Sequence, residues 1–92
     1  MARYLITYDL IKPVQNYETF YETIKQLGSY WCHPLESVWL VKTSLSSVDI
    51  YNSIKPVLQS DNDLLFIVEI TENYYGCMSN ETWEHIKNGI FA

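Results

Sequence analysis

The segment that most constrains the fold lies near the start of the sequence, where residues 3–10 read RYLITYDL. Tyr4, Ile6 and Tyr8 fall on one face of an extended chain and the residues between them on the other, because successive side chains of a strand point to opposite faces. β-Branched and aromatic residues favour such a pleated surface. This apolar run predicts a strand at the centre of a sheet, buried on both faces.

The predicted strand ends at Asp9, and this carboxylate is the first candidate functional residue. The end of a strand is a place where a rigid scaffold positions catalytic and ligand-binding groups. Mg²⁺ or Mn²⁺ takes oxygen ligands, and Mg²⁺ keeps several of its waters, so one carboxylate from each of two subunits would suffice to hold the ion. An aspartate here also serves to end a strand and cap the next turn. Both interpretations stay open.

The rest of the chain alternates helical and strand patterns. Residues 17–27 repeat apolar side chains at helical spacing, with Asn16 as a predicted N-cap and Gly28 as a predicted left-handed C-cap. A second amphipathic helix follows a capping box at residues 46–49, and Pro56 should disturb its last turn. The other predicted elements are a loop at 11–15, strands at 29–32, 37–43 and 64–70, turns at 33–36 and 61–63, and an irregular tail from 71 that ends in a short helix around Trp83, Ile86 and Ile90.

The order β-α-β-β-α-β followed by a tail predicts an α+β fold, a ferredoxin-like sandwich with a short C-terminal helical tail. We expect one domain over residues 1–92, with a core at about 3–70 and the tail at 71–92. In this topology the sheet order is 4-1-3-2 with both main helices on one face. We expect Asp9 to share one edge of the sheet with residues 29–30, 42–44 and 61–63.

Four further residue types in the chain are candidates for chemistry. Lys42 is a candidate phosphate contact, or an ion-pair partner of Asp9 across the strands. Asp61 and Asp63 could add carboxylates to the same edge of the sheet as Asp9, or they could form an ordinary turn. The turn is the favoured interpretation. The histidines and cysteines are interpreted as residues without a catalytic role: His33, His85, Cys32 and Cys77.

Charge and composition limit the partners. The net charge is −5, and one arginine and five lysines offer few contacts for a phosphate backbone, so we expect weak binding of nucleic acid. Aromatic residues make up 15% of the chain, more than a small core needs, and Tyr and Trp are favoured at interfaces, which predicts a homodimer. No apolar stretch approaches ~20 residues and no leader segment is evident, so we expect no membrane partner and a cytoplasmic protein with reduced thiols.

The strand ending Tyr8-Asp9-Leu10, the chain length and the element order resemble the CRISPR-associated protein 2 family. Virulence-associated protein D, a ribonuclease, is a more distant match. Residues 4–10, 36–42 and 54–58 also resemble a group of small bacterial and phage proteins filed under a SinR label. The resemblance implies a homodimer with facing sheets, in which the aspartate ending strand 1 of each subunit holds a divalent metal near the two-fold axis.

Only Tyr8 and Asp9 carry over from that family by position, as candidate catalytic residues, with Asp9 as the metal ligand. The basic residues that the family places after strand 1 and in the first helix are missing here. Two functions therefore stay open. One is a nuclease or phosphodiesterase that depends on Mg²⁺ or Mn²⁺ and acts through paired Asp9. The other is a non-catalytic dimeric interaction module that binds a partner protein or a small (cyclic) nucleotide.

Overall fold

The protein is built on an antiparallel sheet of four strands, as seen in a computed structural model that describes residues 1–11 and 17–92. The strands are β1 (Ala2–Asp9), β2 (Tyr30–Leu35), β3 (Val38–Thr43) and β4 (Leu64–Glu69), and the α-helices are α1 (Tyr17–Lys25), α2 (Ser47–Ile54) and α3 (Asn80–His85). The sheet order is β2-β3-β1-β4, which places β1 in the interior and makes β2 and β4 the edges. The predicted α+β class with a four-stranded antiparallel sheet is confirmed.

Helix α1 forms where the apolar spacing predicts it and buries Phe20 and Ile24. Its predicted N-cap Asn16 and most of the predicted loop before it lie outside the described residues. The predicted left-handed C-cap at Gly28 is wrong, because the backbone dihedral φ there is not in the left-handed range. Glycine is required for another reason: a Cβ at Gly28 would overlap the carbonyl oxygen of Lys42, against which the backbone packs.

Helix α2 follows its sequence signals. The side chain of Ser46 accepts a hydrogen bond from the backbone N–H of Asp49 at 3.1 Å, as an N-cap does. The α-helical part ends at Ile54, and a 3₁₀ turn, η1 (Lys55–Val57), continues it through Pro56. The predicted disturbance at Pro56 is confirmed, because the ring removes a donor from the α-helical hydrogen-bond ladder.

The β2–β3 hairpin is longer than predicted. Strand β2 continues through His33 and Pro34 to Leu35, which leaves only two residues for the turn. The pairing with β3 is irregular between Cys32 and Leu35, where Pro34 lies. A proline is tolerated there because β2 is an edge strand with an irregular register.

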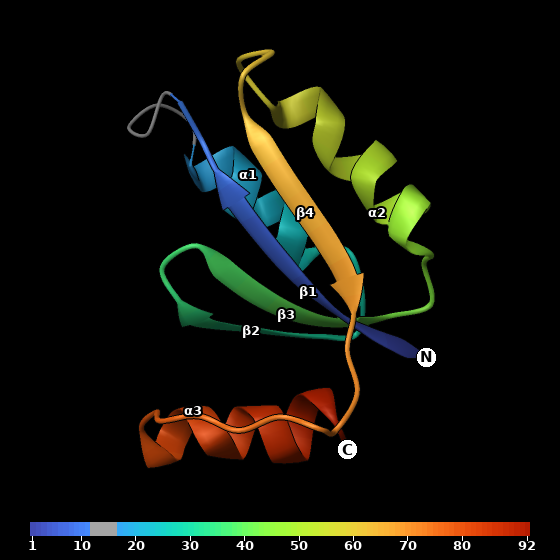
Figure 1. Cartoon of the computed structure of the whole chain (residues 1–92). Helices are drawn as coiled ribbons and strands as arrows, with labels where there is room; N and C mark the ends of the chain where they lie inside the picture. The colour runs from blue at the N-terminus through green and yellow to red at the C-terminus, as the bar shows by residue number, and fades with distance from the viewer. Residues whose placement is uncertain (12–16) are drawn as a thin grey trace.

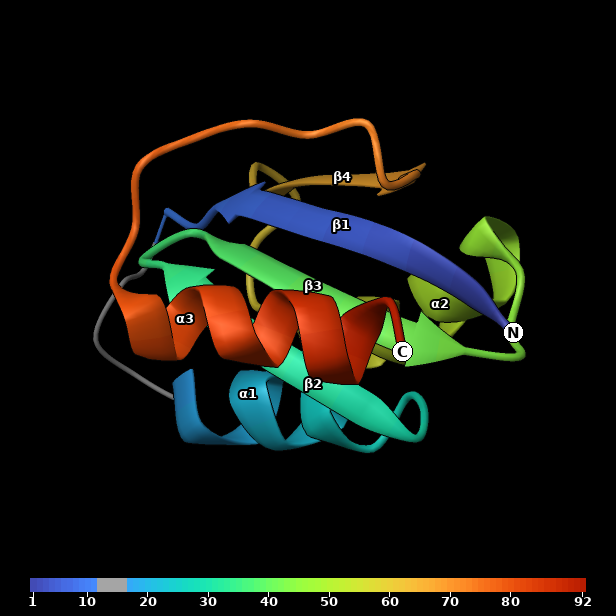
Figure 2. The ribbon, with the colours of Figure 1, turned by 90° about the horizontal axis from the view of Figure 1, so that it is seen from below.

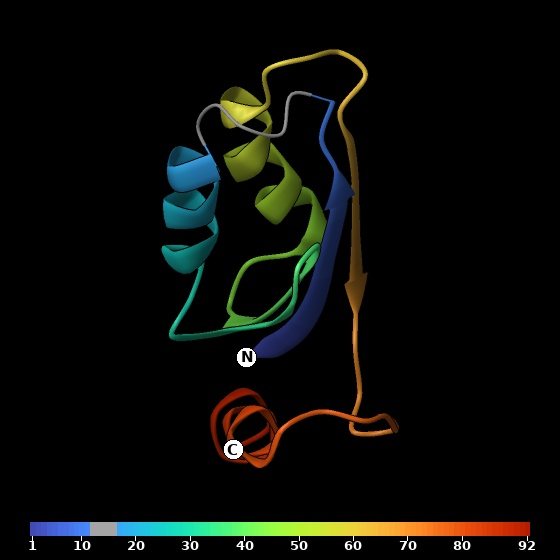
Figure 3. The same cartoon turned by 90° about the vertical axis from the view of Figure 1, so that its left-hand side faces the viewer.

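The main core lies between one face of the sheet and helices α1 and α2, which Figure 3 shows together on that side. Tyr4, Ile6 and Tyr8 of β1 point into it, as their alternation predicts. Trp39 and Val41 of β3 face the same layer and are almost wholly buried. The opposite face of the sheet, which we call the outward face, carries the side chains that alternate with these along each strand.

The tail covers part of this outward face, and the sequence did not predict this. Helix α3 and the π-helical turn η2 (Ile86–Ile90) lie across the β2–β3 side, as Figure 2 shows. Ile86 and Ile90 pack with Cys32 and Leu40 in a second apolar cluster. The outward side of β4 lies outside that cluster. No helix in the described part of the chain is long and apolar enough to cross a membrane.

Candidate functional site

Asp9 ends β1 on the outward face, opposite Leu64 of β4, and is exposed. Within residues 1–11 and 17–92 its carboxylate has no hydrogen bond or ion pair. It lines a shallow hollow of about 300 Å³ with Thr7, Leu64 and Phe66. The strand-end position predicted for Asp9 is therefore observed, and its role as a metal ligand stays a prediction.

Asp63 lies near the same end of the sheet but is committed to a turn. One carboxylate oxygen accepts the backbone N–H of Ile11 at 2.8 Å, and the other accepts those of Gln59 and Ser60 at 3.1 Å. Three backbone hydrogen bonds explain why an aspartate stands there. The favoured interpretation of this residue as turn chemistry is confirmed.

Tyr8 and Asp9 point to opposite faces of the sheet. The Tyr8 ring is buried in the main core, where its hydroxyl donates a hydrogen bond to the Glu36 carbonyl at 3.0 Å and accepts one from the Trp39 indole at 3.2 Å. Burial raises the pKa of Tyr8 well above its usual value. The Tyr8 hydroxyl is therefore bound inside the fold, while the Asp9 carboxylate is exposed on the other face, and a catalytic role for Tyr8 stays a prediction.

The expected clustering of Lys42 with Asp9 is wrong. Because β1 and β3 are antiparallel, Lys42 pairs with Arg3 at the start of β1, and Asp9 lies at the other end. The backbone of Tyr30 pairs with Lys42 at that same distant end. The ammonium of Lys42 donates to the Ala92 carbonyl at 2.9 Å, so it neither pairs with Asp9 nor contacts a phosphate beside it.

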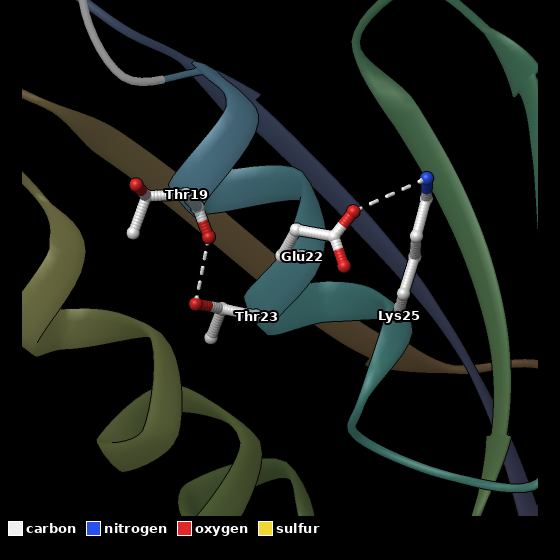
Figure 4. A network of polar contacts seen from close by, with 4 residues as sticks. All are labelled: Thr19, Glu22, Thr23 and Lys25. Atoms are coloured by element: carbon white, nitrogen blue, oxygen red, sulfur yellow. Dashed lines mark hydrogen bonds and ion pairs between the residues drawn. The ribbon is translucent and has the colours of Figure 1, made fainter.

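Other basic side chains are also engaged. Arg3 donates through Nε to the Ile90 carbonyl at 3.0 Å. The ammonium of Lys25 forms an ion pair with a Glu22 carboxylate oxygen at 3.7 Å. Figure 4 shows this pair beside the hydrogen bond between Thr23 and Thr19. The same ammonium lies 4.9 Å from the centre of the Trp31 ring. Few cations are therefore left to neutralise a phosphate backbone.

The Asp9 end of the sheet is acidic without forming a metal cage. The pKa of Tyr17 is raised, first by burial, then by Tyr21 and by the nearby carboxylates of Glu36, Asp9 and Asp63. Among the described residues, no group of three or more His, Cys, Asp or Glu side chains is arranged to hold a metal ion. Within residues 1–11 and 17–92, Asp9 is therefore not part of a ligand set of three or more such side chains.

The most distinctive surface beside Asp9 is apolar. The outward side chains of β4 are Leu64, Phe66 and Val68, with exposed fractions of 62%, 63% and 38%; we call them the β4 stripe. The sequence predicted a final strand at residues 64–70 but did not indicate that one side of it is exposed. The available signal was that the chain holds only two long helices, enough to cover one face of a sheet.

The backbone of β4 is unpaired on its outer side, since β1 is its only partner among the described strands. The N–H of Ile70 donates to the Arg3 carbonyl at 2.8 Å. In an antiparallel pair such bonds recur at every second residue, so the peptide groups of Leu65, Ile67 and Glu69 point away from β1. This edge can accept a further strand.

Both histidines contact other residues of the fold, and one of the two cysteines is buried. His33 stacks on Trp39 with ring centres 4.0 Å apart, and its Nε2 lies 3.0 Å from the Glu36 carbonyl oxygen. His85 shares a hydrogen bond of 2.6 Å with the Tyr30 hydroxyl. Cys32 is buried, which raises the pKa of its thiol, and Cys77 is exposed. Their dispensability for any activity stays a prediction.

Comparison of the chain with protein-family models, with curated proteins and with solved structures gives no match in any of the three.

Proposed function

We propose that this protein is a homodimeric interaction module of ferredoxin-like fold. The observation that carries the proposal is the β4 stripe, three exposed apolar side chains on a strand whose backbone edge is also free. The stripe itself contains no charge, so two copies could pack these three side chains together without burying a charged group of the stripe. The tail occupies the β2–β3 side, which restricts face-to-face packing to β4 and the end of β1.

Several features support the finer assignments. The element order and the sheet order β2-β3-β1-β4, with α1 and α2 on one face, suit a ferredoxin-like sandwich. The free edge of β4 suits a partner protein that adds a strand. Two unpaired thiols suit a reducing compartment, the cytoplasm. Likeness to the CRISPR-associated protein 2 family, with its facing sheets, remains part of this proposal.

The dimer is tested by replacing Phe66 with glutamate. Two buried carboxylates in one small apolar interface would repel each other and lose their hydration, so the Phe66→Glu protein should be monomeric. Light scattering after size exclusion, at 10 to 500 µM protein, should show dimer for the wild type and ~11 kDa for the variant. The control is Tyr51→Glu, which changes an exposed aromatic residue on α2. A wild type that stays at ~11 kDa throughout overturns the proposal.

The second candidate is a nuclease or phosphodiesterase that uses Mg²⁺ or Mn²⁺. It is favoured by one observation: the exposed Asp9 carboxylate lies in the hollow formed with two members of the β4 stripe. If the stripes packed face to face with the two β4 strands running in the same direction, the two Asp9 carboxylates would lie at the same end of the interface. If two β4 edges paired side by side instead, the two β1 strands would stand three strand spacings apart, ~14 Å, too far to share an ion.

This second candidate requires cleavage that depends on the metal and on Asp9. Short RNA, DNA and cyclic dinucleotides would be incubated with Mg²⁺ or Mn²⁺, with the Asp9→Asn variant and an Asp61→Asn control. Loss of at least a hundredfold in rate with the first variant alone would support catalysis. Equal cleavage by wild type and Asp9→Asn would rule out Asp9 as the metal ligand of the reaction.

A further inference from the structure

A second hollow lies on the tail, between α3 and the segment at residues 71–79, which we call the strap. The strap leaves β4, runs in the direction opposite to that of α3 and joins the start of this helix (Figures 1 and 2). The hollow has a volume of about 330 Å³ and is lined by Tyr74, Tyr75, Gly76, Trp83 and Lys87. It is separate from the hollow at Asp9 and does not involve the β4 stripe.

Two of the aromatic rings that line it, those of Tyr74 and Trp83, are held in place by stacking. Trp83 stacks on Tyr74 with ring centres 5.9 Å apart and an interplanar angle of 16°. Tyr74 in turn stacks on Phe91, at 5.4 Å and 23°. Gly76 lies beside the indole, since a Cβ there would be 3.7 Å from Cη2 of Trp83. The rings are therefore anchored by the tail and need little reordering to receive a ligand.

Tyr75 is the one aromatic residue of the hollow that the fold leaves unused. Its exposed fraction is 103%, as high as in an isolated extended chain, and no ring contact involves it among the described residues. A tyrosine ring offers a large rigid face at low cost in conformational entropy, which suits it to stacking on a ligand.

Lys87 is the only charged residue among the described residues that line the hollow, and it is a cation in a chain of net charge −5. It lies four residues after Trp83, so both fall on the same side of the helical tail. Within the described part of the chain its ammonium has no hydrogen bond or ion pair. The nearby Glu84 accepts a hydrogen bond of 2.6 Å from the Asn88 side chain instead.

We propose that this hollow binds a mononucleotide, with its base stacked against Tyr75 and Trp83 and its phosphate on Lys87. Aromatic faces recognise any flat heteroaromatic ring, and a lysine ammonium binds a phosphate as a point charge. A longer strand is disfavoured, because the strap and α3 carry the acids Glu72, Glu81 and Glu84 and no lysine or arginine. The site stands apart from the proposed dimer and does not require it.

The test is a titration with adenosine 5′-monophosphate, followed by the NMR signal of the Trp83 indole N–H and by calorimetry. We expect saturable binding with one site per chain. Adenosine should bind several-fold more weakly, because it lacks the phosphate, and inorganic phosphate alone should leave the indole signal unmoved. A Trp83 signal that does not shift, or shifts without saturating, overturns the proposal.

Two variants separate the stacking from the charge. Tyr75→Ala should weaken binding on the order of tenfold, since each stacked base contributes that order of affinity. Lys87→Gln should reduce the affinity for the monophosphate to that for adenosine and flatten its salt dependence. The wild-type fold should survive both changes, because both side chains are exposed.

The chain offers a matched control. Tyr51 and Lys55 form another exposed tyrosine–lysine pair, with the ammonium 6.0 Å from the ring centre, on α2 and η1 and outside the hollow. Tyr51→Ala and Lys55→Gln should leave binding unchanged. Equal losses in both pairs would reveal a non-specific surface effect and overturn the site. A hexadeoxyadenylate bound ten times more tightly than the monophosphate would reassign the hollow to single-stranded nucleic acid.

Discussion

The indole N–H of Trp39 donates a hydrogen bond to the hydroxyl of Tyr8 across 3.2 Å, between the two interior strands of the sheet. The same hydroxyl donates to the Glu36 carbonyl, so both polar groups of this aromatic pair are satisfied inside the core. Tyr8 also packs edge-on against Phe20 of α1, with ring centres 4.6 Å apart. The tyrosine that precedes Asp9 therefore joins the sheet to the helical layer.

Tyr8→Phe should lower the free energy of unfolding by about 1–3 kcal/mol. The change deletes the acceptor of a buried indole N–H and the donor to a carbonyl, and an unsatisfied buried polar group costs this much. Urea denaturation followed by circular dichroism measures the loss. The control is Tyr51→Phe, which removes an exposed hydroxyl and should stay within about 0.5 kcal/mol of wild type. Equal stabilities of Tyr8→Phe and wild type would contradict the hydrogen-bonded core.

Replacing each of the three glycines with alanine should lower the free energy of unfolding by a different amount. At Gly28 the new Cβ meets the backbone carbonyl of Lys42, which cannot move without distorting β3, so we expect the largest loss, about 3 kcal/mol. At Gly89 the new Cβ meets the Tyr30 ring, which can rotate away but then loses its hydrogen bond to His85. We therefore expect the free energy of unfolding to fall by about 1–2 kcal/mol. Gly76→Ala is the control and should be nearly neutral. Thermal unfolding of the three variants gives the order.

Stability should fall in alkaline solution. Burial raises the pKa of the Cys32 thiol above its usual 9.0, and that of the Tyr8 hydroxyl above its usual 10.0. Above these values the unfolded chain loses protons that the folded protein keeps, so folding becomes less favourable as the pH rises, by up to ~1.4 kcal/mol per pH unit for each group. The slope from both groups vanishes well below pH 9, where the unfolded chain also keeps these protons. Urea midpoints from pH 8 to 11 measure the trend, and Tyr8→Phe should flatten it above pH 10.

Long duplex DNA should bind weakly at ~150 mM salt. Arg3, Lys25 and Lys42 are held by contacts within the chain, which leaves few cations for phosphates. We expect a logarithmic salt slope on the order of one to three per dimer. A shift titration at several salt concentrations measures it, with the Arg3→Gln variant as a comparison that should change little. Nanomolar binding with a slope near eight would contradict the prediction.

The elements themselves were predictable because their signals are local. The spacing of Phe20 and Ile24 follows the period of an α-helix, and the alternation of Tyr4, Ile6 and Tyr8 follows that of a strand. Likewise, Ser46 and Pro56 act on the few residues around them, so the start and end of α2 were foreseen. Each of these signals depends on backbone geometry within one or two turns and needs no knowledge of distant contacts.

The composition of the candidate site was harder to foresee, because it depends on which strand ends meet. Placing Lys42 beside Asp9 overlooked that antiparallel neighbours bring the end of one strand to the start of the other. The environment of Tyr8 likewise depends on Trp39 and Glu36, about 30 residues away in sequence. No local pattern encodes such pairings, which follow from the register of the assembled sheet.

The sequence by itself determined the class of fold, the position of β1 in the sheet interior and the exposure of Asp9 at its end, since these depend on periodicity and on the order of the elements. Only the tertiary structure decided where the tail docks. Ile86 and Ile90 could have packed on any apolar surface, but the outward side of β2 and β3 fits them, with Gly89 against the Tyr30 ring. Because the tail docks there, the β4 stripe stays exposed, and Tyr75 and Lys87 line the same hollow. These contacts join surfaces that meet only after the sheet has formed, so no local sequence pattern predicts them.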